Sequence, residues 1–396
     1  MQVLVLNAGS SSVKFKLFSA KIWSVVASGM IENIFEPIST VYFNTKYKQH
    51  VYSEKIGTHA NAIELLLKML ISHQVIVAFE ELDAVGHRVV HGGDLFHKAV
   101  LITPEVKNKI ASFAPLAPLH NPINLEGMLA VESMIENVPQ VAVFDTAFHH
   151  TIPSYAHRYA LPNFLYEDLG IRRYGFHGTS HHYVASQTAK AMGKKIHELA
   201  MITLHLGNGA SVCAVKGGKS IDTSMGMTPL EGLMMGSRSG DIDPGVIFYL
   251  MNHTQMNAND IEHLLNTQSG LKGIAGTNDM RKIEERINQN DPLAILAMEM
   301  FVYRIIKYIG AYAVALGHLD ALVFTGGIGE HSAKTREAIC TKLTLFGVQI
   351  DTYLNQQNNT LCRSIHDPSS KIALWVTPTD EELSIAKETV QIINRL

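Results

Sequence analysis

One strand–turn–strand pattern occurs twice in this chain, once near its start and again past its midpoint. The first copy is Val3–Phe18 and the second is Met201–Val215, and each joins two apolar strands through a turn rich in Gly, Ser and Asn. Such a turn exposes backbone N–H groups and hydroxyls, and glycine lets a ligand approach the backbone closely. Two such turns indicate a duplicated domain that closes on a polyphosphate. The first hypothesis is therefore a nucleotide-dependent phosphotransferase.

The length and composition fit an enzyme of this kind. A chain of 396 residues is long enough for two domains, each with its own core. The formal net charge of −3 argues against nucleic acid or an anionic membrane as the main partner. Met298–Leu316, the longest apolar stretch, is interrupted by Arg304 and Lys307, so no membrane span is expected.

The start of the chain and its cysteines predict a cytoplasmic protein. Gln2–Leu6 is strand-like and follows no basic segment, so no signal peptide is expected. Cys213, Cys340 and Cys362 have unrelated spacings, which indicates neither a disulfide framework nor a zinc site.

Short apolar strands alternate with helical patterns along the chain, which predicts an α/β fold. The expected strands are Val3–Leu6, Val13–Phe18, Trp23–Met30, Ala84–Val90, Val141–Phe144, Met201–Leu206, Ser211–Lys216, Ala321–Thr325 and Ile372–Val376. The expected helices are Ala60–Ser72, Ile123–Ile135, Tyr183–Ala191, Val246–Met251, Ile261–Asn266, Pro292–Leu316, Thr335–Leu345 and Glu381–Arg395.

The connections between these elements carry three further predictions. Thr379 and Glu382 form a capping-box pattern that would open the last helix and leave Glu381 free to point elsewhere. Ala147–Tyr174 is the expected crossover between the domains, and Asn355–Thr360 is expected to be a surface loop.

Three turns could bind phosphate or nucleoside, although none has the P-loop or dinucleotide spacing. The first contains Asn7, Gly9, Ser10, Ser11, Ser12 and Lys14, and it would bind phosphate and a phosphate-bound Mg²⁺. The second is Gly207–Ser211, and the third, Thr325–Glu330, could lie against a flat nucleoside. The alternative for each turn alone is a plain hairpin or strand–helix connection.

Four charged residues have suitable chemistry and local sequence. Arg88 and Arg238 lie near glycines, and a guanidinium fork suits carboxylate and phosphate. Asp145 ends an apolar run, and the carboxyl ends of strands are where α/β proteins place their sites. Glu381 also follows a strand. The alternatives are surface salt bridges for the arginines and helix-capping or first-turn carboxylates for the acids.

Most of the 20 histidines are expected to be structural or solvated. His149-His150 and His181-His182 have no HExxH or Cys partner that would support zinc. His120 and His177 lie in loops held by prolines or glycines, which would place each ring at a fixed point; a buried structural histidine is the alternative.

Taken together, these segments resemble the acetate kinase family along nearly the whole chain. The motifs that carry the resemblance occur in the family's order: NAGSSSVKF, GHRVVHGG, APLAPLHNP, FDTAFH, RYGFHGTSH, HLGNGAS, DTSMGMTPLEG, FTGGIGE and TDEEL. The resemblance implies two duplicated actin/ribonuclease H-like domains with an active-site cleft between them, and a homodimer. We expect domains at 1–148 plus 383–396 and at 149–382.

The resemblance also implies the reaction ATP + acetate ⇌ ADP + acetyl phosphate with Mg²⁺, for which Mn²⁺ could substitute. Asn7 and Glu381 match the family's metal positions, and Arg88 matches the residue that holds the substrate carboxylate. Asp145 matches the catalytic carboxylate, His177 and Arg238 match transition-state stabilisers, and His120 lies in the corresponding active-site loop. The positions that match the acetate methyl pocket are Val90, Leu119, Phe176 and Pro229. The positions assigned to ATP are Ser10, Ser12, Lys14, His205, Leu206, Gly207, Asn208, Gly209, Asp279, Met280, Arg281, Gly327, Ile328, Gly329, Glu330 and His331.

The reaction independently requires such a set, because an anionic nucleophile must approach a polyanion. One like-charge pair at ~4 Å costs roughly 4 kcal/mol at an effective dielectric of ~20. Acetate is already ionised at neutral pH, so Asp145 is expected to orient groups rather than abstract a proton. Transfer would be direct and in line, without a phosphoenzyme.

The sequence departs from the family pattern at four places: His331 for Asn, Asp380 for Asn, Ser237 for Thr and His150 for Gln. The first leaves the base preference between ATP and GTP open. The nearest alternative function is propionate kinase, although Val90 favours acetate because a smaller residue would make room for another methylene. A nucleotide-binding switch protein without catalysis is the other alternative, and it would be expected to lose Arg88, Asp145, His177 and Arg238.

Overall fold

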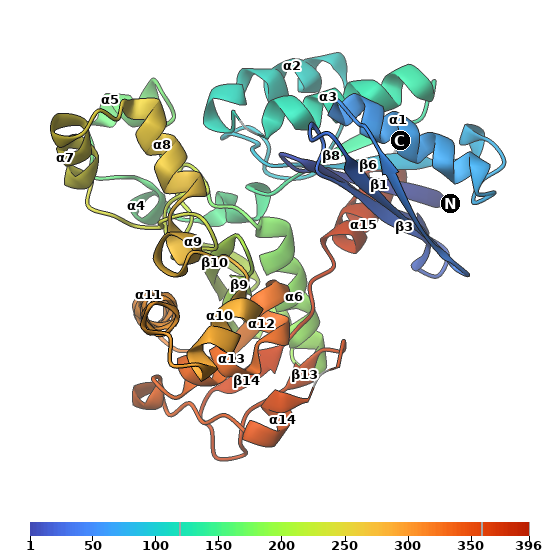
Figure 1. Ribbon diagram of the computed structural model, residues 1–396. Helices are drawn as coiled ribbons and strands as arrows, with labels where there is room; N and C mark the ends of the chain where they lie inside the picture. The colour runs from blue at the N-terminus through green and yellow to red at the C-terminus, as the bar shows by residue number, and fades with distance from the viewer. Residues whose placement is uncertain (119, 358, 396) are drawn as a thin grey trace. The chain divides into compact units, whose positions relative to one another are not determined.

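The computed structural model describes residues 1–118, 120–357 and 359–395. The chain divides into two compact units, which we call unit 1 (Met1–Ala147 with Asp380–Leu396) and unit 2 (Phe148–Thr379). The domain limits expected from the sequence were 148 and 382, against 147 and 379 for these units. Figure 1 shows the N-terminal strands in blue and the last helix, in red, within the same unit.

Unit 1 is built on an eight-stranded sheet of order β5-β4-β3-β2-β1-β6-β8-β7. Its strands are β1 (Gln2–Ala8), β2 (Ser12–Ser19), β3 (Ser24–Glu32), β4 (Ser39–Thr45), β5 (Gln49–Glu54), β6 (Ala84–Val89), β7 (Val100–Leu101) and β8 (Gln140–Phe144). Its helices are α1 (His59–Ser72), α2 (Pro104–Ser112), α3 (Asn121–Met134) and α15 (Glu381–Ile393), with 3-10 turns at Phe79–Glu81 and Ala114–Leu116.

Unit 2 is built on a six-stranded sheet of order β11-β10-β9-β12-β14-β13. Its strands are β9 (Ala200–Leu206), β10 (Ala210–Lys216), β11 (Lys219–Thr223), β12 (Ala321–Thr325), β13 (Arg363–Ser364) and β14 (Ala373–Val376). Its helices are α4 (Ser154–His157), α5 (Asn163–Glu167), α6 (Gly178–Ala191), α7 (Gly245–His253), α8 (Ala258–Thr267), α9 (Gly270–Ala275), α10 (Met280–Asn288), α11 (Pro292–Leu316), α12 (Gly326–His331), α13 (Ala333–Cys340) and α14 (Thr352–Gln356), with 3-10 turns at Ile196–Glu198 and Thr344–Phe346.

The two sheets share a five-strand arrangement. In unit 1, the order β3-β2-β1-β6-β8 has antiparallel pairs up to β1 and parallel pairs from β1 to β8. In unit 2, β11-β10-β9-β12-β14 repeats the same order and the same pair directions. The predicted α/β class with two duplicated domains is confirmed in this topology.

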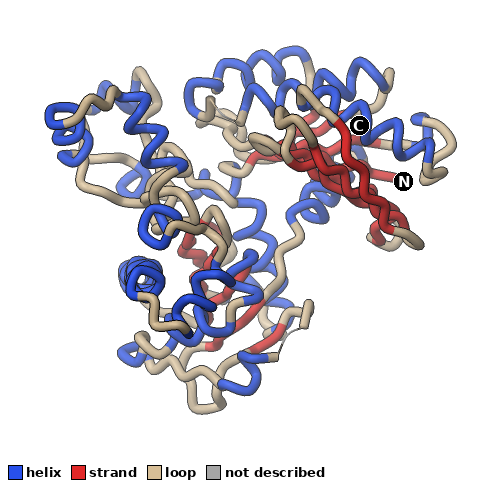
Figure 2. The backbone as a smooth tube through the Cα atoms, in the orientation of Figure 1, coloured by secondary structure: helices blue, strands red, loops and turns tan. Residues whose placement is uncertain are grey.

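Helices cover the sheets and complete the cores (Figure 2). In unit 1, Ile385 and Ala386 of α15 pack on Val3 and Val5 of β1 and Val141 of β8. The other face of the same sheet packs against α1 and α3. In unit 2, α6 packs on β9 and α11 packs on β10. The apolar faces of the strands and helices are buried in these layers, whereas the strand ends remain at the edges, where polar side chains can gather.

Two of the local predictions are wrong. The N-cap of α15 is Asp380, whose side chain accepts a hydrogen bond from the Leu383 amide, so Thr379 and Glu382 do not form a capping box there. Thr379 instead belongs to unit 2, where its hydroxyl accepts from Ser180 at 3.0 Å. The expected surface loop Asn355–Thr360 is wrong only at its start, which lies in α14, where Asn355 is 1% exposed; residue 358 lies outside the described residues, and the rest of the loop is exposed.

Candidate functional site

Unit 1 brings four predicted site residues together at the carboxyl ends of its parallel strands. Asn7 lies near the end of β1, Arg88 near the end of β6, and Asp145 directly after β8. Glu381 is the first residue of α15, which packs against β1, β6 and β8. The carboxyl ends of adjacent parallel strands meet at one edge, and α15 adds Glu381 to the side chains there.

Arg88 is the centre of this cluster. Its Nε lies 3.1 Å from both carboxylate oxygens of Asp145, and its Nη2 donates to Asp145 Oδ2 at 2.5 Å. Its Nη1 donates to Asn7 Oδ1 at 3.1 Å, and its Nε lies 3.9 Å from Glu381 Oε2. Asp145 is only 1% exposed. The guanidinium is therefore fixed in one plane, with one N–H on each terminal nitrogen left without a partner among the described residues.

Burial and the neighbouring charges shift the pKa values of Arg88 and Glu381 in this cluster. Burial opposes the charge on Arg88, but the attraction of Asp145 and Glu381 outweighs it and raises the pKa of the guanidinium. Burial raises the pKa of Glu381 to about 7; Arg88 opposes this rise, and the neighbouring Asp145 and Glu382 add to it. The charged form of Glu381 is therefore costly where it is buried, and a cation bound beside it would favour that form.

The oxygen atoms at this edge fit a hard divalent cation such as Mg²⁺. Asn7 supplies an amide oxygen and Glu381 a carboxylate, the ligand types that Mg²⁺ prefers. Among the described residues, no group of three or more His, Cys, Asp or Glu side chains is arranged to hold a metal. Mg²⁺ commonly keeps several waters and binds substrate phosphates, so one or two protein ligands suffice.

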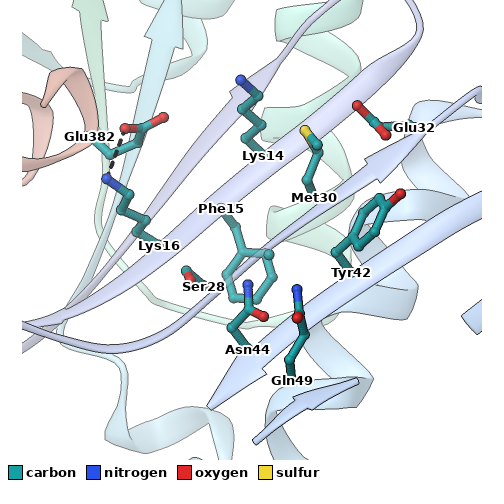
Figure 3. Close-up of a pocket in the computed structure, with 11 residues that line it drawn as sticks. Lys14, Phe15, Lys16, Ser28, Met30, Glu32, Tyr42, Asn44, Gln49 and Glu382 are labelled. Carbon is teal, nitrogen blue, oxygen red and sulfur yellow. Dashed lines mark ion pairs between the residues drawn. The ribbon is translucent and has the colours of Figure 1, made fainter. Parts of the chain in front are cut away.

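Lys14 and Lys16 lie on the same face of β2, beside a groove of about 400 Å³ (Figure 3). Lys16 Nζ lies 2.8 Å from Asp380 Oδ1 and 3.3 Å from Glu382 Oε2, so it ties the first turn of α15 to β2 on both sides of Glu381. Lys14 is exposed and contributes to the field at Glu381. Sequence reasoning assigned Lys14 to ATP and missed the positioning contacts of Lys16.

The loop after β6 is held by two buried asparagines. The amides of Val90 and His91 each donate at 3.1 Å, to Asn124 Oδ1 and Asn121 Oδ1 respectively. Val90 is 4% exposed. His120 is the residue before α3. Leu119 lies outside the described residues, and the other two predicted pocket residues, Phe176 and Pro229, belong to unit 2.

Unit 2 contains a pocket of about 510 Å³ near the ends of β9 and β12. Of the positions assigned to ATP, this pocket is lined by Gly207, Asn208, Asp279, Met280, Arg281, Gly327, Ile328 and His331. Asn278, Glu284 and Ser332 also line it and were not predicted. His205, Leu206, Gly209, Gly329 and Glu330 are not among the lining residues, and Ser10, Ser12 and Lys14 belong to unit 1.

The glycine turn at the base of this pocket is braced from behind. Gly326 has φ 77°, and a Cβ there would lie 2.7 Å from the carbonyl oxygen of Leu206, so only glycine fits. Glu330 Oε1 accepts from the Gly326 amide at 2.9 Å, so this carboxylate holds its own turn. Arg336 is 1% exposed and donates to the carbonyls of Gly329 and Glu330, each at 2.9 Å.

His177 and Arg238 approach the same glycine in unit 2. A Cβ built on Gly209 would lie 3.4 Å from His177 Cε1 and 3.7 Å from Arg238 Nη1. His177 precedes α6 with φ 56°, and its ring stacks on that of His205 with 4.3 Å between centroids. Arg238 Nη1 donates to the Pro229 carbonyl at 3.3 Å. The structure therefore brings together two side chains that are far apart in the sequence.

An ionic network that sequence reasoning missed supports the loop before Arg238. Arg173 donates to the carbonyls of Thr223, Ser224 and Met225 at 2.9 to 3.1 Å, and to Glu231 Oε1 at 2.6 Å. Glu231 also accepts from the Tyr159 hydroxyl. Arg173 and Glu231 lie in the quoted RYGFHGTSH and DTSMGMTPLEG motifs, but sequence reasoning assigned no role to either residue.

A comparison with known families decides the relationship. The sequence profile of the acetokinase family matches residues 2–387. The chain belongs to this family. The acetate kinase of Sulfurovum sp. (strain NBC37-1) is 50% identical over 100% of both chains. The predicted membership, and with it the prediction of a kinase that phosphorylates a carboxylate, is confirmed.

Solved structures of similar proteins agree with the fold. The acetate kinase of Porphyromonas gingivalis has a TM-score of 0.93 at 46% identity, with 99% of each chain covered. A propionate kinase from Francisella tularensis subsp. tularensis SCHU S4 has a TM-score of 0.93 at 44% identity and the same coverage. As for a membrane location, the described residues include no helix with the length and apolar character of a membrane span.

Proposed function

We propose that this protein is an acetate kinase, which transfers the γ-phosphate of ATP to acetate and forms acetyl phosphate and ADP reversibly. The observation that carries the proposal is the guanidinium of Arg88, fixed by Asp145 and Asn7. Its two remaining N–H groups suit the two oxygens of a small carboxylate. The retention of this cluster and of His177 and Arg238 argues against a switch protein without catalysis.

The roles follow from the chemistry of two anions that must react. Arg88 binds and orients the acetate carboxylate, and its charge offsets part of the ~4 kcal/mol repulsion expected per like-charge pair at close range. Asp145 accepts three hydrogen bonds from Arg88, so it orients the guanidinium and does not act as a base. His177 and Arg238 stabilise the charge on the transferring phosphoryl group, and the transfer is direct and in line.

ATP is proposed to bind in the pocket of unit 2 through the residues that line it. The turn at Gly327 and Ile328 offers backbone N–H groups at the start of α12, which suit phosphate or a nucleoside. Arg281 is paired with Asp279 at 2.9 Å at the pocket wall, and His331 is exposed there. Asn7 and Glu381 would hold Mg²⁺, which supplies charge neutralisation of the phosphates when bound.

Acetate is the preferred acid in this proposal because Val90, at the position proposed to line the methyl pocket, would leave little room for another methylene. A methylene in an apolar pocket is worth ~1–3 kcal/mol, so propionate is expected as a weaker substrate. Propionate kinase is the second candidate function, since a relative with that name is 44% identical over 99% of this chain.

A homodimer is also proposed, with α7 in the contact. No residue of α7 is buried, and Phe248 and Tyr249 are 64% and 62% exposed. Exposed aromatic side chains on one short helix are typical of an interface, and a second copy of this chain is the occupant we propose. Light scattering of the wild type and of Phe248→Asp tests this proposal; a monomeric wild type contradicts it.

The three free cysteines agree with a reducing cytoplasmic location.

The test of the function is acyl phosphate formation, trapped with hydroxylamine, from Mg-ATP and acetate, propionate or butyrate in parallel. Acetate is expected to give the highest kcat/KM. A higher kcat/KM with propionate would agree with the proposed mechanism but contradict acetate as the preferred substrate. No product from any acid, with ATP still bound, would refute the proposed activity.

A further inference from the structure

Three buried polar side chains form a hydrogen-bonded row behind His177. Ser211 of β10, His181 of α6 and Thr203 of β9 are each 0% exposed. His177 Nδ1 lies 2.9 Å from Ser211 Oγ, which lies 2.8 Å from His181 Nε2. His181 Nδ1 in turn lies 2.7 Å from Thr203 Oγ1. The row thus connects the ring of His177 to the interior of the sheet.

His181 is the neutral member of the row. Burial lowers its pKa well below the usual value for histidine, and the neighbouring rings of His149 and His205 lower it further. Those rings lie 5.9 and 6.4 Å from it between centroids. A neutral imidazole has one N–H donor and one acceptor nitrogen, so the proton of His181 is on either Nδ1 or Nε2.

Thr203 decides between these two positions. Among the described residues, the only hydrogen-bond partner of its hydroxyl is His181 Nδ1. If Nδ1 carried the proton, it would donate to Thr203, and the Thr203 hydroxyl hydrogen would be buried without an acceptor. Buried donors are rarely left unsatisfied, because they lose their bonds to water without replacement. Thr203 therefore donates to Nδ1, and His181 carries its proton on Nε2.

The hydrogen-bond direction at His181 determines the direction of the bond between Ser211 and His177. His181 Nε2–H donates to Ser211 Oγ, so the Ser211 hydroxyl hydrogen must find another acceptor. The other partner of Ser211 is His177 Nδ1. If His177 also donated to Ser211, the buried serine hydrogen would have no acceptor. His177 Nδ1 therefore accepts from Ser211.

We propose that Thr203 sets the direction of a hydrogen-bond relay through His181 and Ser211 that keeps His177 neutral, with its proton on Nε2. This inference rests on the proposed role of His177 in stabilising the transferring phosphoryl group. In this state, His177 offers an N–H donor to that group, and neither ring nitrogen is available to attack phosphorus. Thr203, His181 and Ser211 are positioning residues, because they act through His177.

The first test is the tautomeric state of the histidines, measured by ¹⁵N NMR of the full-length protein labelled on its histidine rings. Both His177 and His181 are expected to carry the proton on Nε2. A proton on Nδ1 of either ring would overturn the relay. This measurement does not depend on which acid the enzyme phosphorylates, so a correct tautomer pattern with no acetate activity would refute the proposed function alone.

Variants of Ser211 and Thr203 test whether the direction of the hydrogen bonds in this row matters for catalysis. Ser211→Ala removes the link and is expected to lower kcat about tenfold, the lower end of the cost of losing a partner that orients a functional histidine. Thr203→Val is expected to give mixed tautomers at His181 and His177 and a kcat at least twofold lower, with the KM for ATP unchanged. Thr203→Ser retains the hydroxyl and is expected to restore both.

The matched control is Thr188→Val, which removes another buried hydroxyl of unit 2. Thr188 Oγ1 lies 2.7 Å from Thr377 Oγ1, outside the row, so its loss is expected to leave both tautomers unchanged. In the Ser211→Ala background, Thr203→Val is expected to have no further effect on kcat. An additional loss in that double variant, or an equal tautomer change in Thr188→Val, would show a general packing effect and refute the relay.

Discussion

Replacing Arg88 tests the carboxylate site directly. Arg88 uses its other N–H groups to bind Asp145 and Asn7, and two N–H groups without a partner among the described residues are available to a substrate. Two charge-assisted hydrogen bonds of about 1.5 kcal/mol each contribute about 3 kcal/mol. Because about 1.4 kcal/mol corresponds to a factor of ten, Arg88→Met is expected to raise the KM for acetate about 150-fold.

The assay is the initial rate of acyl phosphate formation, with acetate and ATP varied separately. The KM for ATP is expected to change less than about threefold, since the pocket proposed for the nucleotide is lined by residues of unit 2. Arg88→Lys retains the charge without the planar fork and is expected to lie between the wild type and Arg88→Met. Thermal unfolding of each variant controls for stability. Equal rises in the two KM values, or an unchanged KM for acetate, would remove Arg88 from the carboxylate site.

Three other substitutions have separate outcomes. Arg238→Ala is expected to lower kcat by about 10²–10³ with ATP binding intact by calorimetry; a normal kcat would end its transition-state role. Val90→Ala is expected to shift the acetate-to-propionate ratio of kcat/KM about tenfold toward propionate, and an unaltered ratio would show that Val90 does not shape the pocket. Burial of His87 beside Gln140 lowers its pKa to about 4, so protonation favours the unfolded chain below the ordinary value of about 6.5, and stability falls as pH falls. Urea unfolding is expected to show about 2 kcal/mol lost from this group between pH 7 and 5, and a His87→Gln variant with the same pH dependence would contradict this assignment.

Local chemistry marks the ends of one predicted helix, although α2 and α10, which Thr103 and Asp279 cap, were not predicted. The helix 292–316 has its predicted limits, and the structure shows why they are sharp: Asp291 caps it, Pro292 opens it and Gly317 ends it in the left-handed conformation. The strands β4 and β5 were missed, and β5 lies at the sheet edge, where exposed residues give little apolar alternation.

The candidate site was predictable where a motif carried the residue and unpredictable where tertiary contacts decide. Arg88 and Asp145 were proposed separately from their motifs, and the structure joins them at hydrogen-bond distance. The capping error at Thr379 arose because its amide is taken by Glu330 at 3.2 Å, a contact between residues far apart in the chain. Arg336 and Lys16 gave no local signal, because each acts through partners that only the fold brings near.

The return of the last helix to unit 1 has a consequence for synthesis on the ribosome. α15 covers the face of the first sheet that contains Val3 and Val141, and it supplies Glu381. Residues 148–379 must be translated before it, and at about 5–20 residues per second this takes roughly 10 to 50 s. The N-terminal strands therefore leave the ribosome first, and one apolar face of their sheet stays uncovered while the whole of unit 2 is translated. A nascent chain stopped before Asp380 should thus be a better client for a chaperone than one stopped after Ile393.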